Sequence, residues 1–175
     1  TTDEAADAPG ADPATDPGGR PAEPAPSCDT LATDDVTYTI WVNGTDIGPD
    51  LRVATLLPGD EVVVTGTVPA DCVDALTGAL AVATYAAPGA VFDPMATQAL
   101  AGADVCDEDC VDPDGSFTLR HVVVSTDTCG WQVDVVLGPV LETVGPDGGY
   151  YSSTLSGGVD RLLTADNGGS DTCTV

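Results

Sequence analysis

Four aspartates lie close together in the stretch CDEDCVDPDGSF, which runs from Cys106 to Phe117. Carboxylate oxygens are ligands that Ca²⁺ prefers, and the ion takes about six to eight of them. The helical calcium loop does not fit, because counting from Asp109 puts a proline fifth and Arg120 at the place of the required glutamate. The string DPDG is typical of a hairpin turn, which we expect here, with calcium binding as the alternative. The candidate calcium ligands are Asp107, Asp109, Asp112 and Asp114.

His121 is the single histidine of the chain, so a catalytic triad would have to use it. Ser116 and Ser125 are near it in sequence, but no nucleophile-elbow pattern accompanies them. No pair of carboxylates stands apart from the others as the acid and base of a glycoside hydrolase. We therefore expect a packed or edge histidine, no catalytic residues and no cofactor other than the candidate calcium ion.

Three aromatic residues could stack on a sugar ring or another ligand: Trp41, Tyr150 and Tyr151. Trp41 falls on the outward side of its expected strand, opposite Ile40 and Val42. The alternative is that each ring packs against a loop or a second sheet. These three residues are the candidate ligand-binding set.

The cysteines are even in number and spread along the chain, with no CxxC pair. That spacing argues against a zinc site and favours disulfides formed in an oxidising compartment. The sequence does not choose among the pairings, although a bond between Cys106 and Cys110 would close a small ring that is often strained. Pairing either of them with Cys72 or Cys129 is expected to be easier. The cysteines are Cys28, Cys72, Cys106, Cys110, Cys129 and Cys173.

The charge of the chain is strongly one-sided. Its 175 residues carry 29 acidic side chains against 4 arginines and no lysine, for a formal net charge of −25. Such a surface repels phosphate backbones and anionic lipids, so we expect no nucleic-acid partner and no direct membrane insertion. Divalent cations and basic partners are what this field attracts.

Composition divides the chain into two parts. Residues 1–27 hold six of the 14 prolines and no large apolar residue. Such a segment does not bury enough surface to offset its ordering entropy, so we expect a disordered spacer. The remainder, 28–175, is long enough for one domain with a core built mainly from Val, Leu and Ala.

The pattern in 28–175 predicts short strands separated by Gly, Pro and Asp turns. Asn43-Gly44 suits a tight hairpin turn after the first strand, and 95–103 is the best candidate for a short helix on a long connection. In the strand at 131–138, alternation puts Gln132 and Asp134 outward. The pattern predicts an all-β sandwich with Greek-key wiring. The expected strands cover 36–42, 51–57, 61–68, 79–85, 116–124 and 131–138, with short closing strands at 140–144, 150–155 and 159–163.

Several strings resemble bacterial Ig-like surface domains. They are LLPGDEVVVTGTV, ALAVATYAAPG, VDPDGSFTLRHVVV and CGWQVDVVLGPVLETVGPDGGYYS, which together span roughly residues 50–155. The last is similar to the closing strands of secreted and wall-attached proteins of high-GC Gram-positive (actinobacterial-type) bacteria. Some surface adhesin domains lock themselves with a lysine–asparagine isopeptide bond. This chain has no lysine, so disulfides must supply its covalent bracing.

The resemblance implies an extracellular function, either secreted or associated with the cell surface. It implies a non-enzymatic structural or interaction module of the adhesin type, whose partner is a protein or glycan at a cell surface. The alternative is a carbohydrate- or ligand-binding module, calcium-assisted, with Trp41, Tyr150 and Tyr151 as its contacts.

Overall fold

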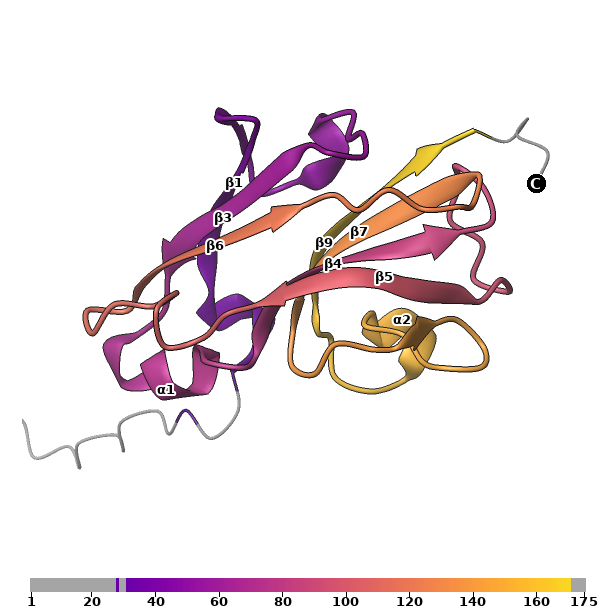
Figure 1. The fold of residues 1–175 in the computed structure, drawn as a ribbon. Coiled ribbons are helices and arrows are strands. Elements are labelled where there is room, and N and C mark those ends of the chain that lie inside the picture. Colours follow the sequence, from indigo (N-terminus) through magenta and orange to yellow (C-terminus); the bar gives the residue numbers. More distant parts are fainter. Residues whose placement is uncertain (1–27, 29–30, 171–175) are drawn as a thin grey trace, which may run out of the picture.

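Two antiparallel sheets pack together in the computed structural model, which describes residue 28 and residues 31–170 (Figure 1). The first sheet has the strand order β2-β1-β3-β6, and the second has the order β8-β5-β4-β7-β9. The strands of the first sheet are β1 (Thr37–Val42), β2 (Thr45–Gly48), β3 (Glu61–Thr67) and β6 (Ser116–Val122). Those of the second are β4 (Leu80–Ala87), β5 (Gln98–Val105), β7 (Gly130–Leu137), β8 (Thr143–Val144) and β9 (Leu162–Gly169). The predicted spacer at 1–27 and Cys173 lie outside the described residues.

Within residues 31–170, helix is confined to short turns. The α-helices are α1 (Val73–Leu76) and α2 (Ser153–Ser156), and the 3-10 helices are η1 (Thr33–Asp35), η2 (Leu51–Val53) and η3 (Ala70–Cys72). In the part of the chain that the structure describes, no helix has both the length and the apolar character needed to cross a membrane.

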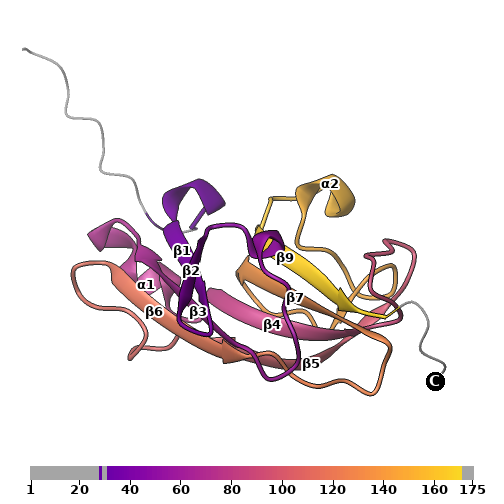
Figure 2. The same ribbon diagram turned by 90° about the horizontal axis from the view of Figure 1, so that it is seen from above.

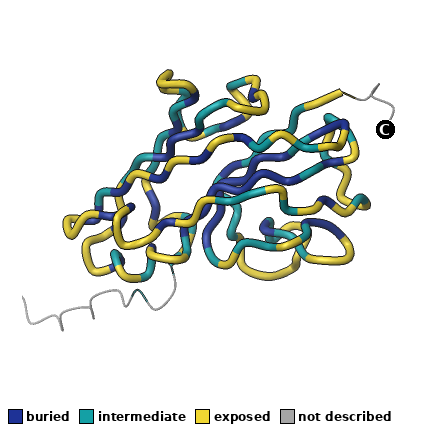
Figure 3. Tube along the Cα trace, in the orientation of Figure 1, coloured by how far each residue is buried: buried dark blue, intermediate teal, exposed yellow. Residues whose placement is uncertain are grey.

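The main core fills the space between the sheets. Because side chains alternate along a strand, every second residue of β1, β3, β4, β6 and β7 points into this space. The predicted inward residues Ile40, Val64, Phe117 and Val133 are all buried there. Figure 3 shows buried positions along the central strands of both sheets. The alternation thus predicted the inner face of each of these strands correctly.

The chain crosses from one sheet to the other three times before β8. β3 leads through η3 and α1 into β4, β5 returns to β6, and β6 leads into β7. β6 also contacts β4 and β5, so the first sheet borders the second along this side (Figure 2).

The partner strand of the first hairpin was predicted at 51–57, and this is wrong. Asn43 and Gly44 have φ of 49° and 78°, which is the left-handed backbone of a two-residue hairpin turn. The returning strand therefore starts at once, as β2, with Val42 paired to Thr45. The stretch Leu51–Val53 is instead the 3-10 helix η2, whose start is capped by the Asp50 side chain accepting from Arg52 N–H.

The predicted helix at 95–103 is also wrong, because most of this stretch belongs to strand β5. Alanine favours helix, but pairing with β4 on one side and β8 on the other overrides that preference. Within β5, a Cβ at Gly102 would lie 2.8 Å from Cγ2 of Val124. The glycine lets the chain leaving β6 pass close to β5.

The closing strands are confirmed only in part. β8 lies within 140–144, and β9 begins within 159–163 but continues to Gly169. The stretch 150–155 does not form a strand, because it leads into α2, whose start is capped by the Ser152 hydroxyl accepting from Thr154 N–H.

Residues 139–161, which we call the covering segment, pair with the edge of the second sheet at β8 and otherwise fold over its outer face (Figure 1). Beneath this segment lies a second apolar cluster that includes Ala83, Tyr85 and Tyr151. Gln132 and Asp134 do point to this outer face, as predicted. They are nevertheless buried, at 5% and 0% exposure, because the covering segment excludes water from them.

Candidate functional site

The acidic stretch forms a turn whose carboxylates bond to neighbouring backbone and hydroxyl groups. Asp114 accepts hydrogen bonds from the Ser116 hydroxyl and N–H at 2.7 and 3.0 Å, and these bonds lower the pKa of Asp114. Asp107 accepts from Asp109 N–H at 3.1 Å. The carbonyl of Asp112 accepts from Gly115 N–H at 2.9 Å, which closes the predicted DPDG turn.

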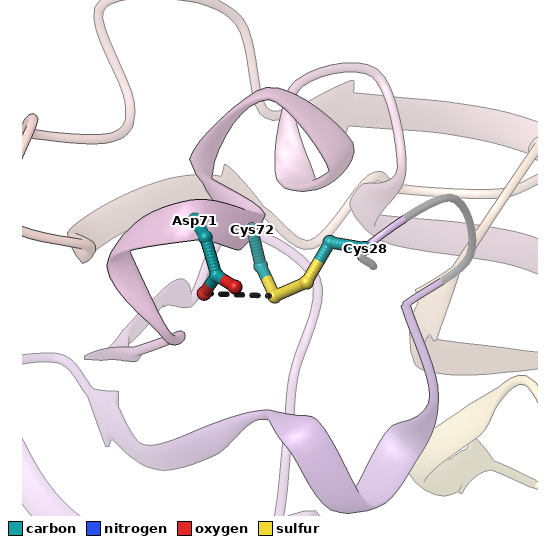
Figure 4. A group of neighbouring side chains, drawn as sticks. All are labelled: Cys28, Asp71 and Cys72. Carbon is teal, nitrogen blue, oxygen red and sulfur yellow. Dashed lines mark hydrogen bonds between the residues drawn. A yellow bond between two sulfur atoms is a disulfide. The ribbon is translucent and has the colours of Figure 1, made fainter. Parts of the chain in front are cut away.

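The four aspartates do not converge on a common point. Among the described residues, one group of three or more metal-capable side chains has its ligand atoms within 4.8 Å of one another. That group is Cys28, Asp71 and Cys72, shown in Figure 4. Its two sulfurs form a disulfide and so carry no thiolate charge for a metal. The Asp71 carboxylate lies 3.8 Å from the Cys72 sulfur.

The disulfides differ from the pairing expected to be easier. Cys106 and Cys110 bond to each other, and Cys28 bonds to Cys72. The short ring is accommodated because the chain turns between Asp107 and Cys110, where Cys110 N–H donates to the Asp107 carbonyl at 3.2 Å. This turn brings the Cα atoms of the pair to 5.2 Å, a usual distance for a disulfide. Cys129 is also disulfide-bonded.

His121 is packed between the sheets, with 2% exposure. Its Nε2 lies 2.7 Å from the Thr84 hydroxyl and its Nδ1 lies 2.8 Å from the Asp104 carboxylate. The Thr84 hydroxyl also accepts from Val124 N–H at 3.3 Å. This order of hydroxyl, imidazole and carboxylate resembles a catalytic triad, but the hydroxyl is fully buried and no cavity leads to it among those lined by described residues.

The three candidate aromatic residues lie on different parts of the molecule. Trp41 is in β1, half-buried beside Val63, and its Nε1–H donates to the Thr65 hydroxyl at 3.3 Å. Tyr151 is buried in the covering segment, where its hydroxyl lies 2.7 Å from that of Tyr85. Tyr150 is partly exposed next to it. The fold therefore brings the two tyrosines together and leaves Trp41 in the other sheet.

A cavity of about 280 Å³ lies between the covering segment and the outer face of β7 and β9. Its floor is polar and carries Gln132, Asp134 and Asn167, which face one another on neighbouring strands. Its walls are mostly apolar and come from the covering segment, from Phe92 in the β4–β5 connection and from β9. The wall residues are Phe92, Val144, Tyr150, Tyr151, Ser152, Leu155, Leu162 and Ala165.

The polar floor is held by a chain of side-chain amides. The Oε1 atom of Gln132 accepts from Nε2 of Gln98 at 2.9 Å and from Nδ2 of Asn167 at 3.1 Å. Nε2 of Gln132 donates to Oδ1 of Asp134 at 2.6 Å. The other carboxylate oxygen, Oδ2, is buried and has no hydrogen-bond partner.

Burial controls the protonation of this region. It raises the pKa of Asp134 to about 7, because the charged carboxylate loses its hydration and recovers only the Gln132 hydrogen bond. Burial also raises the pKa of the Tyr85 and Tyr151 hydroxyls, which therefore stay neutral at physiological pH. A carboxyl group that titrates near neutral pH, beside a cavity, is a feature of binding and catalytic sites.

Alternation alone assigned Gln132 and Asp134 to the outward face and missed that a cavity forms there. One signal was present in the string ALAVATYAA of β4, which is apolar at both alternating sets of positions. A strand of that kind is covered on both faces. Its neighbours in the sheet must then be covered as well.

Comparison with protein-family models, with curated proteins and with solved structures gives no match for this chain.

Proposed function

We propose that this chain is an Ig-like β-sandwich that serves outside the cell as a non-enzymatic structural and interaction module. The strand order supports the Ig-like part of the proposal. The neighbours β1, β3 and β6 correspond to immunoglobulin strands A, B and E, and the neighbours β4, β7 and β9 correspond to C, F and G. β5 lies beside β4, at the place of strand C′ in variable-type domains.

The observation that carries the non-enzymatic part is the use of His121. Both ring nitrogens are engaged, one by Thr84 and one by Asp104, and the ring is buried where the sheets meet. His121, the strongest candidate for a catalytic base, therefore uses both ring nitrogens to join strands. Its arrangement supports a role in stability.

The disulfides support an extracellular location. Such bonds persist in oxidising compartments and are rare in the cytosol. The bond between Cys28 and Cys72 ties the start of the domain to η3, and the bond between Cys106 and Cys110 closes the turn after β5. Both disulfides lie outside the strands, in segments of the kind that proteases cleave most readily.

Surface charge indicates the kind of partner. Each arginine in the described part of the chain is engaged within the molecule. Arg52 pairs with Asp50, Arg120 pairs with Glu61, and Arg161 donates to the backbone carbonyls of Leu137 and Pro139. Most exposed carboxylates therefore lack a cation, which favours a partner with a basic surface.

Co-sedimentation with bacterial cell-envelope fragments tests this function. We expect the oxidised chain to bind saturably to envelopes of high-GC Gram-positive bacteria, and we expect high salt or protease treatment of the envelope to remove the binding. Binding that survives protease but is lost after glycan digestion would favour the carbohydrate-binding alternative. Absence of saturable binding to every envelope fraction would contradict the proposal.

A further inference from the structure

The cavity beneath the covering segment contains an acceptor without a donor. Asp134 is fully buried and lines the cavity, and its Oδ2 has no partner among the described residues. Leaving a buried carboxylate oxygen unpaired is costly, so a native fold usually supplies a donor or binds one. The amides around it form other bonds: Gln132 donates to the opposite oxygen, and Asn167 donates to Gln132.

The residues that line the cavity indicate the sign of the ligand's charge. Besides Asp134, the titratable groups on the cavity wall are the hydroxyls of Tyr150 and Tyr151, and no arginine or histidine lines it. An anionic ligand would meet a carboxylate without a compensating cation. A positively charged donor would instead complete Oδ2 and gain from the strongly negative molecule around it.

The size and walls of the cavity limit the rest of the ligand. A volume of about 280 Å³ is at the small end for binding sites, so it suits one ring or a short branched chain. Phe92, Leu155 and Leu162 offer apolar contacts, and the ring of Tyr150 can face a cation. Leu155 is 42% exposed and Tyr150 is partly exposed, which places them where a ligand would enter.

We propose that this cavity binds a small organic ammonium ion, with the ammonium group on Oδ2 of Asp134 and the apolar part against Phe92 and Leu162. Gln132 is the positioning residue, because its amide holds Oδ1 and leaves Oδ2 as the carboxylate oxygen without a donor. Asn167 and Gln98 in turn fix the amide of Gln132. This inference goes beyond the proposed interaction function, and its failure would leave that function untouched.

Titration calorimetry with benzylammonium chloride tests the site, with benzyl alcohol and sodium benzoate as uncharged and anionic controls of the same shape. We expect saturable one-site binding of benzylammonium alone. Asp134→Asn should weaken it by about tenfold or more, which is the loss expected for a charge-assisted hydrogen bond. Asp166→Asn is the matched control, because it removes the same charge from β9 at a residue that does not line the cavity.

A second variant decides the outcome if Asp134→Asn does not fold. Ala165→Leu adds bulk at the cavity wall and keeps every polar group, so it should also abolish binding. In the native chain, benzylammonium should shift the NMR resonances of cavity-lining residues, among them Asp134, Phe92 and Ala165. The proposal is overturned by absence of binding, by equal binding of benzyl alcohol, or by binding that Ala165→Leu leaves unchanged.

Discussion

Nε2 of His121 lies 2.7 Å from the hydroxyl of Thr84, and this contact joins strand β6 of the first sheet to strand β4 of the second. Nδ1 of the same ring lies 2.8 Å from Asp104 on β5. The single histidine of the chain therefore connects three consecutive strands, one from the first sheet and two from the second. Its contribution to stability can be measured directly.

His121→Ala should lower the free energy of unfolding by about 2–4 kcal/mol, because it leaves a cavity and removes one of the hydrogen-bond partners of the buried Thr84 hydroxyl. Urea denaturation followed by fluorescence measures the change. Arg120→Ala is the control, because this neighbour on β6 is exposed and its ion pair with Glu61 lies at the surface. Equal losses for the two variants would show that the contacts of His121 contribute nothing.

The two disulfides should differ in how much they stabilise the fold. They span 44 and 4 residues, and the chain-entropy model gives more stability to the bond that closes the longer loop. Replacing Cys28 and Cys72 by serine should cost about 4 kcal/mol, and replacing Cys106 and Cys110 about 2 kcal/mol. Denaturation of the two double variants under oxidising conditions measures both values. The reverse order would mean that local packing outweighs loop entropy.

Asp134 should make the fold less stable as the pH rises. Its pKa is about 7 in the folded chain against an ordinary value of 3.8, so the folded state holds this proton more tightly than the unfolded state does. The free energy of unfolding therefore falls through this window as the pH rises, and the loss is complete above the folded pKa. Tyr85 and Tyr151, which face Asp134, have raised pKa values and stay neutral over this range.

Asp134→Asn removes the loss of stability that ionisation of the buried carboxyl causes. Relative to the native chain, the variant should gain about 2–3 kcal/mol more at pH 8 than at pH 5. Thermal unfolding at the two pH values measures the difference. Asp109→Asn is the control, because it removes one charge at an exposed position. A gain from Asp134→Asn that is the same at both pH values would contradict the assignment.

Gly115 should tolerate no side chain. It has φ of 87°, and a Cβ there would lie 2.2 Å from the Val68 carbonyl oxygen. Gly59 has a similar φ of 94° but nothing within 4 Å of its Cβ position. Gly59→Ala should therefore cost about 1–2 kcal/mol for backbone strain alone, and Gly115→Ala at least about 3 kcal/mol, because the turn must also move away from Val68. Similar losses in urea denaturation would show that the turn has room.

The amino-acid sequence by itself determined the features that depend on neighbouring residues. Alternation placed Ile40, Val64, Phe117 and Val133 in the core, because the side-chain period of a strand does not depend on what the strand pairs with. The turn at Asn43-Gly44 and the turn at DPDG followed from the backbone preferences of those residues.

The tertiary structure alone decided the features that depend on distant contacts. Alanine-rich β5 became a strand because β4 and β8 pair with it, and pairing energy exceeds the small helix preference of alanine. His121 acquired Thr84 and Asp104, which lie 37 and 17 residues away. Gln132 and Asp134 became a buried site because the covering segment folds back over their side of the sheet. Whether a polar side chain on an alternating strand meets water depends on what covers it, and a local pattern carries no information about that.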